Sequence, residues 1–127
     1  MREITSEWVA KAEGDYRSAE ALLTLLEIPE IDTACFHCQQ CAEKYIKAFL
    51  VEHEVDFPRN HDLVRLMMLC LKVDKSFETI HDYLRRLENY GVIIRYPGLT
   101  VPAEMAHEAL ENASRVRAFV RKKLKIK

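Results

Sequence analysis

The chain has 127 residues, of which 49% are hydrophobic and 31% are charged, and its formal net charge is −1. This length and composition predict one globular domain over residues 1–127, and the near-neutral charge argues against capture of nucleic acid by the whole surface. The chain has only three glycines and four prolines, too few turn residues for the many loops of a β-sandwich or barrel.

The first predicted helix begins after Thr5 or Ser6, which are good N-cap residues, and ends before Pro29. Its apolar residues recur at spacings close to the helical period, which indicates one buried face. They are Trp8, Ala12, Tyr16, Ala19, Leu23 and Leu26. No apolar segment with a cleavage site lies near the N-terminus and no run is long enough to span a bilayer. We therefore expect a cytoplasmic protein without a membrane segment.

The second predicted helix begins at Asp32 or Thr33 and runs to about Glu54. Its apolar stripe consists of Ile31, Ala34, Cys38, Cys41, Tyr45 and Ala48. Along the flank of that stripe runs a row of polar residues at the same spacing, namely His37, Gln40, Lys44 and Lys47. This row is typical of the solvated side of a helix, although it could also face an anionic ligand. Glu43 and Lys47 form a favourable i,i+4 pair on the same helix.

Three more helices are predicted in the second half of the chain, with Asn60, Ser76 and Thr100 as their N-caps. The segment 92–96 favours β-structure but has no strand to pair with, so we interpret it as an extended exit or a frayed last helical turn. Pro97 and Gly98 form a turn. The chain is therefore predicted to be all-α, an up-and-down bundle of about five helices.

The cysteines of the second helix allow two interpretations. His37, Cys38 and Cys41 have a spacing that zinc sites use, and Cys70 or His81 could add a ligand from another helix. However, clusters with this cysteine spacing are normally carried by loops, and the flanking pattern here is continuously helical. Because free cysteine is often buried and packs like a small apolar residue, we predict that the thiols belong to the core. No metal and no other cofactor is expected.

Four segments together resemble the HEPN family (higher eukaryotes and prokaryotes nucleotide-binding domains). The segments are residues 8–21 with their alanines, residues 36–50 with Gln40, Glu43, Lys44 and Lys47, the sequence Asn60-His61-Asp62-Leu63, and Arg95-Tyr96-Pro97. The resemblance implies a helical bundle that commonly forms a homodimer. It also implies a partnership with a small nucleotidyltransferase in a toxin–antitoxin or nucleotide-handling system.

Many proteins of this family are metal-independent ribonucleases marked by an arginine, four to six intervening residues and a histidine. In such a pair the arginine binds a phosphate and the histidine moves protons. Arg95 stands at the place of that arginine, but Thr-Val-Pro occupies residues 100–102, and the next histidine downstream is His107. A ribonuclease would therefore need His61 or His107 to act with Arg95 from another direction.

We expect a non-catalytic module that binds a nucleotide or a partner protein. Its candidate ligand-binding residues are Arg95, Tyr96, Lys44, Lys47, Gln40 and His61. Two alternatives stay open at the level of sequence. The chain could be an RNA-cleaving toxin with a displaced catalytic histidine, or a metal-binding helical bundle.

Overall fold

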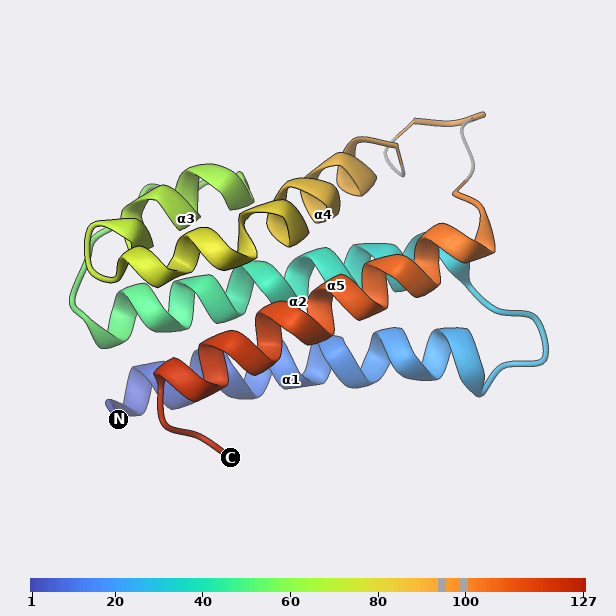
Figure 1. Cartoon of the computed structure of the whole chain (residues 1–127). Coiled ribbons are helices and arrows are strands. Elements are labelled where there is room, and N and C mark those ends of the chain that lie inside the picture. The colour runs from blue at the N-terminus through green and yellow to red at the C-terminus, as the bar shows by residue number, and fades with distance from the viewer. Residues whose placement is uncertain (94–95, 99–100) are drawn as a thin grey trace.

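The computed structural model describes residues 1–93, 96–98 and 101–127, and it confirms the predicted all-α bundle (Figure 1). Its elements are α1 (Glu3–Thr24), α2 (Ile31–Glu52), α3 (Leu63–Leu71), the 3₁₀ helix η1 (Lys75–Ile80), α4 (His81–Ile93) and α5 (Ala103–Lys123). The described residues contain no strand. None of their helices combines the length and the apolar character needed to cross a membrane.

Helix α2 is the centre of the bundle. It packs lengthwise against α1 and also contacts α3, α4 and α5 (Figure 1). From Cys41 to Leu50 every residue of α2 except Lys44 is buried. A helix that is covered on nearly all sides needs apolar or paired side chains around its whole circumference, so α2 is also where buried polar residues must find partners within the protein.

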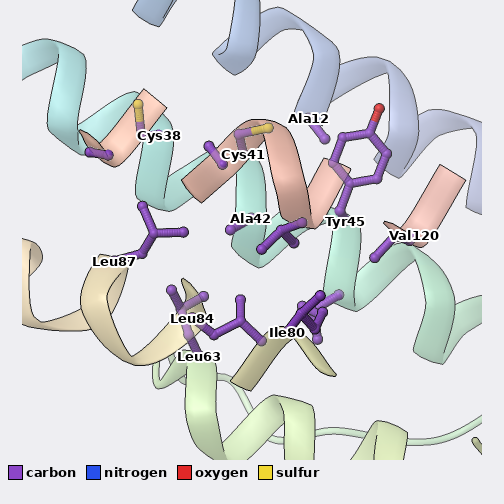
Figure 2. Close-up of a cluster of buried hydrophobic side chains, with 14 of the residues drawn as sticks. Ala12, Cys38, Cys41, Ala42, Tyr45, Leu63, Ile80, Leu84, Leu87 and Val120 are labelled. Carbon is purple, nitrogen blue, oxygen red and sulfur yellow. The ribbon is translucent and has the colours of Figure 1, made fainter. Parts of the chain in front are cut away.

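Small side chains bring the helices close to α2. Ala12 and Ala19 of α1 are fully buried, and alanine or cysteine at the facing positions of α2 leaves room for close backbone approach. Figure 2 shows how larger side chains fill the other side of α2. The leucines with no exposed surface are Leu50, Leu63, Leu66, Leu84 and Leu87. Each contributes roughly 1.5–3 kcal/mol by burial of its side chain.

The predicted N-caps of three elements are wrong. Helix α1 begins at Glu3, behind Arg2 as N-cap. Thr5 lies inside the helix, because its hydroxyl is buried and donates to the Glu52 carboxylate of α2 at 2.9 Å. The Thr5 hydroxyl, which the local sequence pattern predicted to cap α1, therefore links α1 to α2.

Aspartates replace the other two predicted caps. Asp62, not Asn60, caps α3 by accepting from the backbone N–H of Arg65 at 3.0 Å. Asp74 caps η1 and accepts from the backbone N–H of Ser76 at 2.9 Å. Helix α4 follows directly and extends to Ile93, so the beginning of the predicted exit segment is helical.

The start of the last helix was also predicted slightly too early. Pro102 is the N-cap of α5, and the predicted cap Thr100 lies outside the described residues. Helix α2 begins at Ile31, one residue before the first predicted position, and ends at Glu52.

Candidate functional site

The polar row of α2 faces α1 and is not a solvated surface. His37 Nδ1 lies 2.7 Å from Asp15 Oδ1 of α1, and Lys44 Nζ donates to Asp15 Oδ2 at 2.5 Å. Asp15 is itself buried, and the Lys44 ammonium compensates its charge while the His37 ring lies within hydrogen-bond distance. Gln40 is half-buried in the same row. The ammonium of Lys44 is therefore engaged within the protein.

Glu43 lies at the centre of a second polar group, one turn further along α2. Its carboxylate accepts from Lys47 Nζ at 3.0 Å, and both side chains are buried. This confirms the predicted i,i+4 pair. The ammonium of Lys47 also lies 5.7 Å and 5.6 Å from the ring centres of Trp8 and Phe57, within the range of a cation–π interaction.

His61 completes this group from the segment that leads into α3. Its ring Nδ1 lies 3.0 Å and 3.1 Å from the two carboxylate oxygens of Glu43. The His61 side chain is 68% exposed, whereas that of Glu43 is 4% exposed. The buried carboxylate thus orients an imidazole whose other nitrogen is available to solvent, an arrangement that suits proton transfer.

A pair of carboxyl groups, Asp62 and Glu88, lies next to His61, where the start of α3 meets the second half of α4. Burial raises the pKa of Glu88 to about 7, and its hydrogen bond to Asp62 acts in the same direction. The same bond lowers the pKa of Asp62. The two carboxyl groups therefore share one proton, with Glu88 as the donor.

The remaining candidate residues lie elsewhere. Tyr96 is exposed in the connection between α4 and α5, and His107 is exposed on α5. Arg95 lies outside the described residues. Of the predicted ligand-binding residues, the structure brings Lys47 and His61 together through Glu43. No hydrogen bond within the described part of the chain joins His107 to His61.

The thiols are core residues, as their helical spacing predicted. Cys38 and Cys41 have no exposed surface, and burial raises both thiol pKa values far above the usual range. Burial also raises the pKa of Cys35 to about 11 and that of Cys70 to about 12. A metal requires the thiolate. Among the described residues, no group of three His, Cys, Asp or Glu side chains is arranged to hold a metal ion.

A comparison with protein families decides what kind of bundle this is. The family model of the HEPN domain matches residues 5–123, which is nearly the whole chain. The chain belongs to the HEPN family.

Two solved structures share this fold along almost their entire length. ST0689, described as an archaeal HEPN homologue, superposes with a TM-score of 0.73 at 23% identity and covers 97% of this chain and 98% of its own. TT1696 from Thermus thermophilus gives a TM-score of 0.76 at 25% identity, covering 96% and 99%.

A curated relative carries a functional name. The protein called "Putative toxin MJ1304" from Methanocaldococcus jannaschii is 28% identical over 96 residues, or 71% of this chain. The matched part spans 61% of that relative's own length.

The HEPN bundle also contains a polar network that the sequence did not predict. Arg117 of α5 donates twice to the Glu13 carboxylate of α1, at 2.6 Å and 2.7 Å. Tyr45 of α2 donates to the same carboxylate at 2.5 Å, and Arg121 donates to the Tyr45 hydroxyl at 3.1 Å. Two arginines of the basic last helix are thus engaged in holding three helices together. The sequence contained one hint of this network, since Glu13 adjoins the apolar face of its helix and the polar hydroxyl of Tyr45 lies within the apolar stripe of the next.

Proposed function

We propose that this HEPN protein works by binding a partner protein in a toxin–antitoxin type pair and does not cleave RNA itself. The name of the curated relative supports the toxin context. The family resemblance points to a small nucleotidyltransferase as the partner, with a nucleotide as the other possible ligand. The absence of a histidine at the expected distance after Arg95 supports a role without catalysis.

One observation carries the proposal, namely that the polar candidate groups are already paired within the chain. Lys44 is bound to Asp15, while Lys47 and His61 are bound to Glu43. An anionic ligand at these residues would have to compete with two carboxylates. This geometry favours a protein surface elsewhere over a nucleotide site along α2.

The end of the bundle with the α1–α2 connection offers such a surface. Leu25 and Ile28 of this connection are 79% and 77% exposed, and Phe36 on the first turns of α2 is also exposed. The α4–α5 connection with exposed Tyr96 lies at the same end (Figure 1). Exposed apolar side chains that gather in one region are typical of protein interaction sites. We call these four residues the apolar end.

Charge indicates what kind of partner fits the apolar end. Glu27, Glu30 and Asp32 are exposed beside it. A second copy of this chain would bring like charges together if it docked with the same end. A different protein with an apolar patch and a basic rim is therefore the better match.

The test is a titration of this protein with a small nucleotidyltransferase from the same organism, taken as the candidate partner. We expect Ile28→Asp to weaken binding at least about tenfold, because it places a charge in the centre of an apolar contact. The free energy of unfolding should change by less than about 0.5 kcal/mol, since Ile28 is exposed. Met68→Asp is the matched control, because Met68 is 58% exposed but lies on α3. Equal affinity of all three proteins would contradict the proposed surface.

A ribonuclease is the second candidate, and the contact between Glu43 and His61 favours it. A carboxylate-oriented histidine could take a proton from a ribose 2′-hydroxyl. Incubation of RNA with the purified protein, its His61→Ala variant and its His107→Ala variant separates the two functions. Cleavage that only His61→Ala abolishes would establish the ribonuclease, whereas intact RNA with all three proteins agrees with a binding module.

A further inference from the structure

A basic hollow lies between η1 and the C-terminal end of α5. Figure 1 shows that this end of α5 lies at the same end of the bundle as both termini. Its volume is about 420 Å³. The lining residues are Ser76, Thr79, Phe119, Lys122, Lys123 and Lys125. Three lysines thus surround a concave surface of roughly the size that small ligands occupy.

The two hydroxyl groups that line the hollow donate their hydrogen bonds to acceptors within the protein. The Ser76 hydroxyl donates to Asp74 at 2.6 Å and the Thr79 hydroxyl donates to the backbone carbonyl of Ser76 at 2.8 Å. The side chains that can donate to a ligand in this hollow are therefore the lysine ammonium groups, which act as mobile point charges and suit phosphate oxygens.

One lysine of the hollow is restrained by a carboxylate. Lys123 Nζ lies 2.8 Å from Asp74 Oδ2, and this contact is the main reason why the pKa of Asp74 is lowered to about 2. Its ammonium also lies 5.4 Å from the ring centre of Phe119. Lys122 and Lys125 are exposed on either side.

The backbone holds Lys125 at a position that normally favours glycine. Its φ is +62°, in the left-handed region, where it follows the C-cap of α5. The N–H of Lys125 donates to the carbonyl of Lys122 at 3.1 Å, and that of Ile126 donates to the carbonyl of Arg121 at 2.8 Å. This is the Schellman motif. Lys125 thus occupies a backbone position at which glycine would be less strained, and its side chain lines the hollow.

Lys123 and Lys125 also line an adjacent hollow of about 490 Å³ beside Met1, Glu52 and His53. Lys123 and Lys125 therefore lie between two neighbouring hollows. A ligand with several consecutive phosphates could contact these two lysines from either hollow.

We propose that the hollow between η1 and α5 binds consecutive phosphates, as found in a nucleic-acid strand or a nucleoside polyphosphate. This site is separate from the apolar end and does not depend on the proposed partner binding. Lys122 and Lys125 contact the phosphates, and Lys123 joins them when a phosphate replaces Asp74.

Two substitutions with opposite effects test the site. Lys125→Gly removes an ammonium while placing the residue that the backbone favours, so folding should be preserved and phosphate binding should weaken about fivefold. Asp74→Asn keeps a good N-cap for η1 and frees Lys123, so binding should strengthen about threefold. The matched backbone control is Glu54→Gly, because Glu54 has a φ of +55° at the equivalent position after α2.

Binding of tripolyphosphate, ATP and a short single-stranded RNA is measured by calorimetry at low salt, and the melting temperature of each variant is recorded. If RNA binds far more tightly than tripolyphosphate, the ligand is a nucleic-acid strand. The slope of the logarithm of the binding constant against the logarithm of the salt concentration should then be smaller by about 0.7 in Lys125→Gly. Equal binding of ATP and RNA identifies a nucleoside polyphosphate. The proposal is overturned if Lys125→Gly and Asp74→Asn bind all three probes like the wild type, or if Glu54→Gly loses as much affinity as Lys125→Gly.

Discussion

Individual side chains at the start of α3 do more than cap a helix. Asp62 accepts from the backbone of Arg65 and also shares a proton with Glu88 of α4. The adjacent His61 contacts the buried carboxylate of Glu43 on α2. These contacts join three helices, and the pair of Asp62 and Glu88 couples protonation to the packing of α4 against the start of α3.

The Glu88 carboxyl group makes stability depend on pH. Its pKa is about 7 in the folded protein against 4.5 for the free group. At a pH between these two pKa values, Glu88 keeps its proton in the folded chain and has released it in the unfolded chain. The contribution of Glu88 is therefore complete below about pH 4.5 and is lost as the pH rises to about 7.

We predict that Glu88→Gln removes this loss, because the amide can still donate to Asp62 but does not titrate. Denaturant unfolding at about pH 5 and about pH 8 measures the effect. The stability of the wild type should fall more than that of the variant between these conditions. Glu20→Gln, at an exposed position on α1, is the control and should follow the wild type. A parallel pH dependence of Glu88→Gln and the wild type would show that Glu88 does not hold this proton.

At the scale of elements, apolar stripes predict which faces of the helices meet, and polar groups link the helices across those contacts. Glu13 of α1 receives hydrogen bonds from Tyr45 of α2 and Arg117 of α5. Arg117 lowers the pKa of Glu13, and Glu13 in turn raises the pKa of Arg117. The Arg117 side chain also covers the ring of Tyr16 at 4.9 Å.

We predict that Glu13→Ala lowers the free energy of unfolding by about 2–3 kcal/mol, because it leaves a half-buried guanidinium and a buried hydroxyl without their acceptor. Glu111→Ala is the control. It breaks an exposed i,i+4 contact with Arg115, which should cost less than about 0.5 kcal/mol. Because the pKa of Glu13 is lowered, its contribution is present above about pH 4.5 and disappears as the pH falls through the folded pKa. Equal losses in the two variants would contradict a role for the network.

At the scale of the whole molecule, the two ends of the bundle differ in character. The end with the α1–α2 connection exposes apolar and acidic side chains, whereas the lysines around the hollow belong to the other end. Figure 1 shows the α1–α2 connection and the termini at opposite ends of the bundle. This polarity explains why a net charge of −1 does not exclude a local site for phosphate.

The homodimer that the family resemblance implies remains a prediction. We expect it to form along the sides of the helices, since the acidic apolar end disfavours contact with its own copy. Light scattering should then give the same mass for Ile28→Asp and the wild type, while only the variant loses the partner protein. Dissociation of the dimer by Ile28→Asp would show instead that this end joins two copies.

Local signals in the sequence predicted the helices well and their polar contacts poorly. The apolar residues of α2 and the burial of Cys38 follow from spacing alone. The cap at Thr5 and the solvated row around Lys44 were wrong, because each side chain found a partner on another helix. Arg95, the residue on which the ribonuclease motif depends, lies outside the described residues, so its predicted role remains untested.

The sequence by itself determined an all-helical bundle, because the helical period of apolar and small residues is a local property that each segment carries on its own. Only the tertiary structure decided which charges meet. Glu43 and His61 are 18 residues apart, and Glu13 and Arg117 are 104 residues apart. Such pairs leave no local pattern, since a charged side chain at the edge of an apolar stripe can turn toward solvent or toward another helix, and the packing of the helices selects between the two.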